Sequence, residues 1–149
     1  MSKAWSVLLQ LAEQQVEQAQ ISLVQIDAAI ARIQRRQEQV RALIAENEAR
    51  RRGQGGSQTM AQMQVVTQFL VNLSKVLPAL ENELAGLRHQ RAATVEFLAR
   101  ARREEKRMQA LVERDAARLS KEKAERDQRE MDAAGIGLFN RRKVAALGS

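Results

Sequence analysis

The chain has 149 residues, a length typical of one domain, and a formal net charge of +7. Aromatic residues make up 3% of it and charged residues 29%, with one proline and no tyrosine or cysteine. Many Ala, Leu, Glu, Gln and Arg with so few rings are typical of long helices and coiled coils. The lack of cysteine excludes disulfides and thiolate metal sites. No apolar run approaches the roughly 18 residues of a membrane-spanning helix, and we expect no signal peptide.

The first part of the chain carries apolar side chains at alternating intervals of three and four residues. These positions are Leu9, Ala12, Val16, Ala19, Leu23, Ile26, Ile30, Ile33, Gln37, Val40, Ile44 and Asn47. Ten of the twelve are apolar, with Gln37 and Asn47 as the exceptions. A seven-residue repeat sustained over this length predicts a left-handed coiled coil. We therefore expect one long helix over about residues 4–52.

A second heptad series follows a short glycine-rich stretch and predicts another helix over about residues 60–134. Its positions are Met63, Val66, Leu70, Leu73, Leu77, Leu80, Leu84 and Leu87. The series is interrupted at Arg91 and Thr94, and we interpret Val95 and Leu98 as a four-residue stutter that partly restores it. Beyond that point apolar residues are sparse on a highly charged helix.

The stretch between the two series, residues 53–59, contains Gly53, Gly55 and Gly56. Glycine accepts positive φ without strain and can reverse the chain, and Ser57 or Thr59 can cap the following helix. A reversal here pairs residues whose numbers sum to about 112 and brings the richest apolar segments together. We therefore predict an all-α fold: a two-helix antiparallel coiled-coil hairpin with a longer second helix, forming a single coiled-coil domain over residues 1–149.

The two helices are unequal, so about 28 residues of the second, roughly 107–134, should extend past the N-terminal end of the first. This overhang has no internal partner and is expected to rely on ion pairs at helical spacing, such as Glu122 with Arg126 and Glu125 with Arg129. The helix is expected to stop near Gly135, leaving a basic tail over residues 135–149.

Two single residues add to this prediction. Pro78 removes one backbone hydrogen bond inside the second helix, so we expect a kink one turn back, near Ser74. That kink is either plain curvature or a bend that shapes a docking surface. Trp5 is expected to pack near the open end of the hairpin.

The sequence offers little chemistry for catalysis. His89 is the single histidine and lies in the polar run LRHQR, and the carboxylates alternate with Arg and Lys. The run GIGLFN follows a helix and lacks the dinucleotide and phosphate-loop patterns. We predict no enzyme activity, no cofactor, no metal site and no small-molecule ligand. Nucleic acid is not the expected partner, because acids dilute the basic residues on every face and aromatic platforms for bases are missing.

One apolar stripe lies outside the seam of the second helix. Phe69, Leu73 and Val76 are spaced at i, i+4 and i+7 on one helical face, and Val65 lies beside them. They either widen the internal seam near the turn or form an exposed stripe that docks a partner.

Two local matches make the chain resemble the FliJ family, the stalk-like coiled-coil component of the flagellar type III export apparatus and its virulence-secretion counterparts. LAEQQVEQA, residues 11–19, is similar to the family's LAE-x-x-VE-x-A opening, and DQREMD, residues 127–132, is similar to its DQ-x-x-MD stretch. The order of helix, turn, longer helix and basic tail agrees as well. Ala133, where the family has an acid, and the glycines at 135 and 137 depart from the pattern.

The resemblance implies a non-enzymatic stalk, similar to the rotor of rotary ATPases, that couples a hexameric export ATPase to the membrane export gate and engages export chaperones. It places the export gate on Phe69, Leu73 and Val76. It places the ATPase at the open end, where the expected contacts are Arg107, Arg114, Arg118, Asp127, Gln128, Met131 and Asp132. It implies a cytoplasmic location at the inner face of the membrane.

Two other interpretations stay open from the residues alone. One is a basic coiled-coil scaffold or chaperone that binds acidic partners or nucleic acid, whose binding would be salt-sensitive. The other is a parallel homodimer of long helices without a hairpin, which a cross-link within one chain would exclude.

Overall fold

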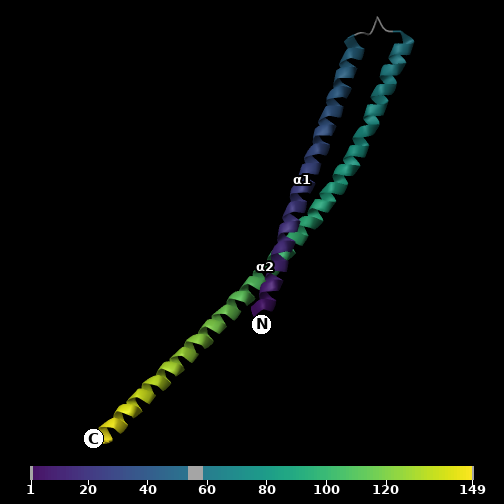
Figure 1. The fold of residues 1–149 in the computed structure, drawn as a ribbon. Helices are drawn as coiled ribbons and strands as arrows, with labels where there is room; N and C mark the ends of the chain where they lie inside the picture. Colours follow the sequence, from purple (N-terminus) through teal and green to yellow (C-terminus); the bar gives the residue numbers. More distant parts are fainter. Residues whose placement is uncertain (1, 54–58, 149) are drawn as a thin grey trace. The chain divides into compact units, whose positions relative to one another are not determined.

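A computed structural model describes residues 2–53 and 59–148 of the chain. It contains helix α1, Ser2–Gly53, and helix α2, Met60–Leu147, and no strand occurs within these ranges. The two helices pack against each other and α2 is the longer, which confirms the predicted all-α two-helix fold (Figure 1). The turn expected over residues 53–59 lies mostly outside the described residues, as do Gly55, Gly56 and Ser57.

The packed side chains of α1 are the ones that the heptad pattern selects. All twelve predicted seam positions between Leu9 and Asn47 are buried or half-buried. In α2 the same holds for the predicted positions from Val66 to Leu87, whereas Met63, in the first turn, is exposed. A seven-residue repeat thus produces a narrow apolar seam with solvent on both sides.

The chain forms two compact units, which we describe separately. Unit 2, Gln15–Ala101, contains most of α1 and the first half of α2. Unit 1 joins Met1–Gln14 to Arg102–Ser149. The expectation of a single coiled-coil domain stays a prediction.

Unit 2 holds two clusters of buried side chains. Ile33, Leu80 and Leu84 form one, with Ile30, Val40 and Leu87 packed against it. The other consists of Val16, Ala19, Leu98 and Ala101, with Leu23 beside it. Because residues from both helices meet in each cluster, burial between α1 and α2 stabilises this unit.

The register of the hairpin differs from the predicted one. Gln37 Nε2 donates to Glu81 Oε2 at 3.0 Å, and Arg91 Nε donates to Asp27 Oδ1 at 2.6 Å. Both pairs have residue numbers that sum to 118, not to the predicted 112. The residues at which α1 ends and α2 begins, Gly53 and Met60, sum to 113, close to the prediction, so the helix ends alone do not give the register.

The predicted stutter in α2 is wrong. Thr94, Leu98 and Ala101 continue the seam at intervals of four and three, and Val95 is exposed. Arg91 occupies a seam position, and its ion pair with Asp27 accommodates the charge at the surface of unit 2. The heptad repeat is therefore unbroken, with a charged residue inside it.

A capping box begins α2. Thr59 Oγ1 accepts a hydrogen bond from the backbone N of Gln62 at 3.2 Å, and Gln62 Oε1 accepts one from the backbone N of Thr59 at 3.1 Å. This reciprocal pair satisfies two donors that a helix start leaves free. Thr59 is thus one of the two predicted caps.

Helix α2 does not end at Gly135. It continues through Gly135 and Gly137 to Leu147, so the predicted basic tail is helical. A glycine ends a helix when it adopts positive φ, and no described glycine does so. Ala133 and Ala134 before these glycines, and the run LFNRRKVAAL after them, favour helix. Pro78 also lies inside α2; the kink near Ser74 stays a prediction.

The unpaired part of α2 starts later than predicted and is longer. In unit 1, Ala12 of α1 and Met108 of α2 are buried, and Asp115 is the last half-buried residue before a long exposed stretch. From Ala116 to Leu147 every residue is exposed except Gly137, which is half-buried. We call residues 116–147 the arm, and at ~1.5 Å per residue it is about 48 Å long.

Candidate partner-binding surfaces

The two sides of the seam in unit 2 differ in chemistry. One side, the polar edge, carries the Asp27–Arg91 and Gln37–Glu81 pairs. The hydrogen bond to Asp27, and then its charge, raise the pKa of Arg91 above its ordinary value. The other side, the neutral edge, carries Gln18, Ser22 and Gln25 of α1 and Gln90, Ala93 and Phe97 of α2. These six side chains line two shallow surface grooves without any charged residue.

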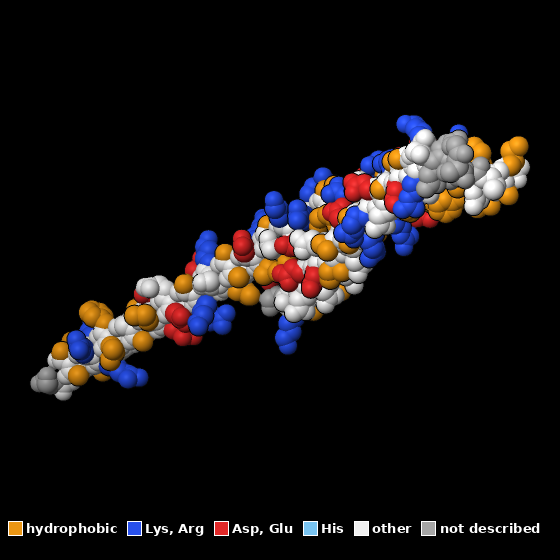
Figure 2. Space-filling model, turned by 90° about the horizontal axis from the view of Figure 1, so that it is seen from above, with side chains coloured by type: hydrophobic (Ala, Val, Ile, Leu, Met, Phe, Trp, Pro, Cys, Tyr) orange, Lys and Arg blue, Asp and Glu red, His pale blue; other side chains and the backbone are white. Residues whose placement is uncertain are grey.

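The predicted gate-binding stripe is exposed at the neutral edge. Phe69 is 44% exposed and Val76 is 40% exposed, whereas Leu73 is half-buried in the seam. Phe69 and Val76 are thus exposed and do not widen the internal seam, while docking of a partner on them stays a prediction. Figure 2 shows hydrophobic side chains gathered at the end of unit 2 where α2 begins.

Two exposed residues with similar positions escaped the sequence analysis. Phe97 follows Phe69 by four heptads and Val76 by three, so it lies on the same helical face. Leu43 of α1 is exposed and directly precedes the seam residue Ile44, as Phe69 directly precedes Leu70. Such positions of two antiparallel helices lie on the same side of the seam. Phe69, Val76 and Phe97 share one heptad position, so the sequence contained this pattern. The predicted stutter shifted the expected repeat before Phe97 and hid it.

The predicted ATPase contacts divide into two groups. The first lies at the end of the paired part of unit 1 and in the first turn of the arm: Arg114 and Arg118 line a groove with Trp5, Leu111 and Asp115. Trp5 is half-buried there, as expected for the open end. Arg118 Nη2 donates to Asp115 Oδ1 at 2.9 Å, and Arg107 forms a longer ion pair with Glu104, at 3.8 Å.

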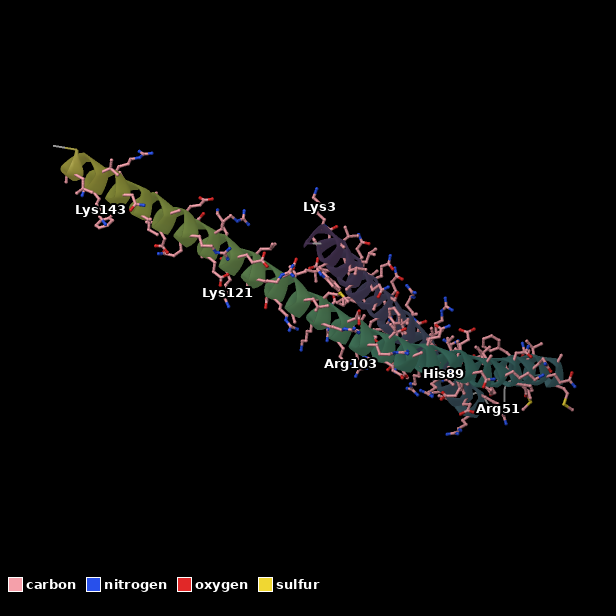
Figure 3. The ribbon with its side chains drawn as sticks, turned by 90° about the horizontal axis from the view of Figure 1, so that it is seen from below. Lys3, Arg51, His89, Arg103, Lys121 and Lys143 are labelled. Carbon is pink, nitrogen blue, oxygen red and sulfur yellow. The ribbon has the colours of Figure 1, made fainter. Side chains whose placement is uncertain are left out.

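The second group, Asp127, Gln128, Met131 and Asp132, lies on the arm. All four are exposed, and Gln128 Nε2 donates to Asp132 Oδ1 at 3.1 Å. The predicted pair of Glu125 with Arg129 is present at 3.9 Å; among the described residues no ion pair joins Glu122 to Arg126. Figure 3 shows Lys121 and Lys143 projecting outward from α2. The structure thus places these residues on a solvated single helix.

A model of the protein family described as "Flagellar FliJ protein" matches residues 1–143. The chain belongs to the FliJ family. The match confirms the resemblance noted in the two end motifs, and it spans both helices and every candidate contact named above. Membership makes the chain a flagellar or type III export-related protein, in a family of non-catalytic, cytoplasmic export components. Comparisons with curated proteins and with solved structures gave no match.

Other features of this FliJ family member bear on its chemistry. Within residues 2–53 and 59–148, neither helix has a stretch long and apolar enough to cross a membrane. The same residues contain no group of three or more His, Asp or Glu side chains placed to hold a metal ion. His89 is exposed on the surface of α2 (Figure 3). The described surface thus carries two sets of predicted contact residues, one in each unit.

Proposed function

We propose that this FliJ family member is a non-enzymatic coupling part that links the hexameric export ATPase to the membrane export gate. Export chaperones are further partners in this proposal. The protein would work in the cytoplasm, at the inner face of the membrane. We expect the arm and the paired end of unit 1 to contact the ATPase, and the exposed stripe in unit 2 to contact the gate.

The observation that carries the proposal is the arm. A helix that leaves its partner and stays exposed over 32 residues gains nothing from burial within this chain. Side chains of both charge signs alternate along it (Figure 2). Distributed charge contacts suit a ring of identical subunits, because an asymmetric helix cannot pair specifically with every subunit at once.

The test uses the ATPase purified from the same organism. We expect the full-length chain to co-purify with it and to change hexamer assembly and ATP turnover. A chain truncated after Asp115 lacks the arm but keeps the paired helices, and it should lose most of this effect. If the full-length chain changes neither assembly nor turnover, the coupling role is wrong.

The gate contact needs a separate measurement. Phe69→Ala combined with Val76→Ala removes one exposed aromatic ring and one exposed branched side chain, and it leaves every buried side chain unchanged. Binding to the cytoplasmic part of the export gate should fall about tenfold or more, since exposed apolar anchors dominate such contacts. Val24→Ala, an exposed apolar residue of α1, is the matched control and should leave binding unchanged.

A further inference from the structure

One end of unit 2 carries positive charge alone. Residues 49–80 are the longest stretch of the sequence without Asp or Glu. Arg50, Arg51 and Arg52 lie in the last turn of α1, and α2 begins at the same end of the unit (Figure 1). We call the described residues at this end, 50–53 and 60–69, the tip.

Helix stability explains only part of this pattern. Cations in the last turn of a helix interact favourably with its dipole, and acids in the first turn do the same. The arginines of α1 follow this rule, but α2 has no acid in its first turn. Arg50 pairs with Glu46 at 2.7 Å. Arg51 and Arg52 are exposed and form no ion pair among the described residues, so two positive charges face solvent at the tip.

The tip also exposes apolar side chains at the start of α2. Met60 is 77% exposed and Val65 is 70% exposed, and both line a shallow surface groove together with Met63. The other residues of this groove are uncharged as well: Ala61, Gln64, Thr67 and Gln68. Side chains of a helix tilt toward its N-terminus, so those of Met60 and Met63 lean toward the end of the tip. Apolar surface and unpaired cations thus lie at the same end of unit 2.

This combination restricts the partner. A nucleic-acid backbone can pair with the arginines but offers no apolar surface, and Phe69 is the single aromatic residue of the tip on which a base could stack. An acidic protein would need a matching apolar hollow beside its acids. An anionic lipid bilayer supplies both features without a match of shape, because charged headgroups lie directly above an apolar layer.

The second basic cluster of the chain, residues 141–143, lacks this arrangement. Leu138, Phe139 and Val144 beside it are exposed. Because successive residues of a helix are turned by about 100°, these three side chains point to different sides of the arm. They also lean back from the C-terminal end of α2. The cluster therefore serves as a control for positive charge alone.

We propose that the tip binds the surface of an anionic lipid bilayer. Arg51 and Arg52 contact the lipid phosphates, and Met60 and Val65 enter the apolar boundary below them. Two cations and a few apolar side chains give a reversible, peripheral contact. The inference goes beyond the proposed coupling role, since neither the ATPase nor the gate takes part in this contact.

Flotation of the full-length chain with lipid vesicles tests the proposal at about 0.15 M salt. The chain binds vesicles of phosphatidylglycerol and phosphatidylcholine, and it binds phosphatidylcholine vesicles much more weakly. Arg51→Gln combined with Arg52→Gln lowers the affinity for the anionic vesicles about thirtyfold, the effect of two cations near a charged lipid surface. Arg141→Gln combined with Arg142→Gln is the matched control, because it removes two adjacent exposed arginines and leaves the affinity unchanged.

A fluorescent label distinguishes a bilayer from other anionic surfaces. The chain has no cysteine, so Met60→Cys carries a single environment-sensitive dye. Its emission increases and shifts to shorter wavelength with anionic vesicles, because the dye enters an apolar layer. The same dye at Val24→Cys, on an exposed apolar position of α1, shows no change.

Three results would overturn the proposal: no flotation with anionic vesicles, equal loss of affinity in the two double-arginine variants, or flotation without a response of the dye at position 60. All three are independent of the proposed function. The variants leave Phe69 and Val76 unchanged, so binding to the ATPase and to the gate is measured separately and can fail while the lipid contact holds.

Discussion

The most deeply buried side chain of the seam provides a quantitative test of the fold. Leu84 is 2% exposed and packs with Ile33 and Leu80 in unit 2. Leu84→Ala removes three carbon groups at about 0.8 kcal/mol each, or about 2.4 kcal/mol in transfer free energy. The cavity left by the substitution adds to this loss of free energy. Side chains around a seam with solvent on both sides can move inward, however, and reduce the cavity. We therefore expect a loss of about 2–3 kcal/mol, in the lower half of the usual range for such substitutions.

Urea unfolding followed by circular dichroism, with the chain at one fixed concentration, measures this loss of unfolding free energy. In a thermal scan of a chain of this length, the melting temperature should fall by roughly 5–10 °C. Leu119→Ala is the matched control, because Leu119 is 45% exposed on the arm; its effect should stay within about 0.5 kcal/mol. Equal losses for the two variants would refute the assignment of the core to this seam.

Three further predictions follow from individual contacts. Thr59→Ala removes the capping box and should cost about 1 kcal/mol of unfolding free energy, whereas Thr59→Ser should retain most of it. Cysteines placed at positions 27 and 91 should join within one chain through a short bismaleimide, and cysteines at 27 and 85 should not; a cross-link only between two chains would contradict the hairpin. Arg91→Leu extends the apolar seam and should raise the melting temperature; a decrease would show that the ion pair with Asp27 matters more.

The sequence predicted which side chains pack but not which residues face each other. The heptad series of α1 matched the buried positions because burial on a coiled coil depends only on the local repeat. A seven-residue repeat is unchanged when one helix slides by seven residues. The predicted sum of 112 lies close to the alignment one heptad short of the observed one, and the apolar pattern cannot distinguish these alignments.

Polar residues do distinguish them. In the observed alignment Asp27 meets Arg91 and Gln37 meets Glu81. Sliding by one heptad would place Leu84 opposite Asp27 and Ser74 opposite Gln37, so both polar pairs would be lost. A search for complementary pairs across the seam would therefore have found the register, whereas the glycines mark only where the chain reverses.

The sequence could not predict the end of α2 or the groove at Asp115, for two different physical reasons. Glycine permits a helix to end without requiring it, so Gly135 and Gly137 alone could not show where α2 ends. Asp115 looks in the sequence like one more acid in a charged helix. Its burial depends on the alignment with Trp5, which the repeat left undetermined.

The balance of charge over residues 116–132, the first half of the arm, has a kinetic consequence. From Ala116 to Asp132 there are five basic and five acidic residues. The basic ones are Arg118, Lys121, Lys123, Arg126 and Arg129; the acidic ones are Glu122, Glu125, Asp127, Glu130 and Asp132. Opposite charges one helical turn apart cancel within a Debye length of about 8 Å, so this segment projects almost no long-range field. Electrostatic attraction then does not speed up the association of this segment with a partner. Differences in its affinity would come mainly from the rate of dissociation.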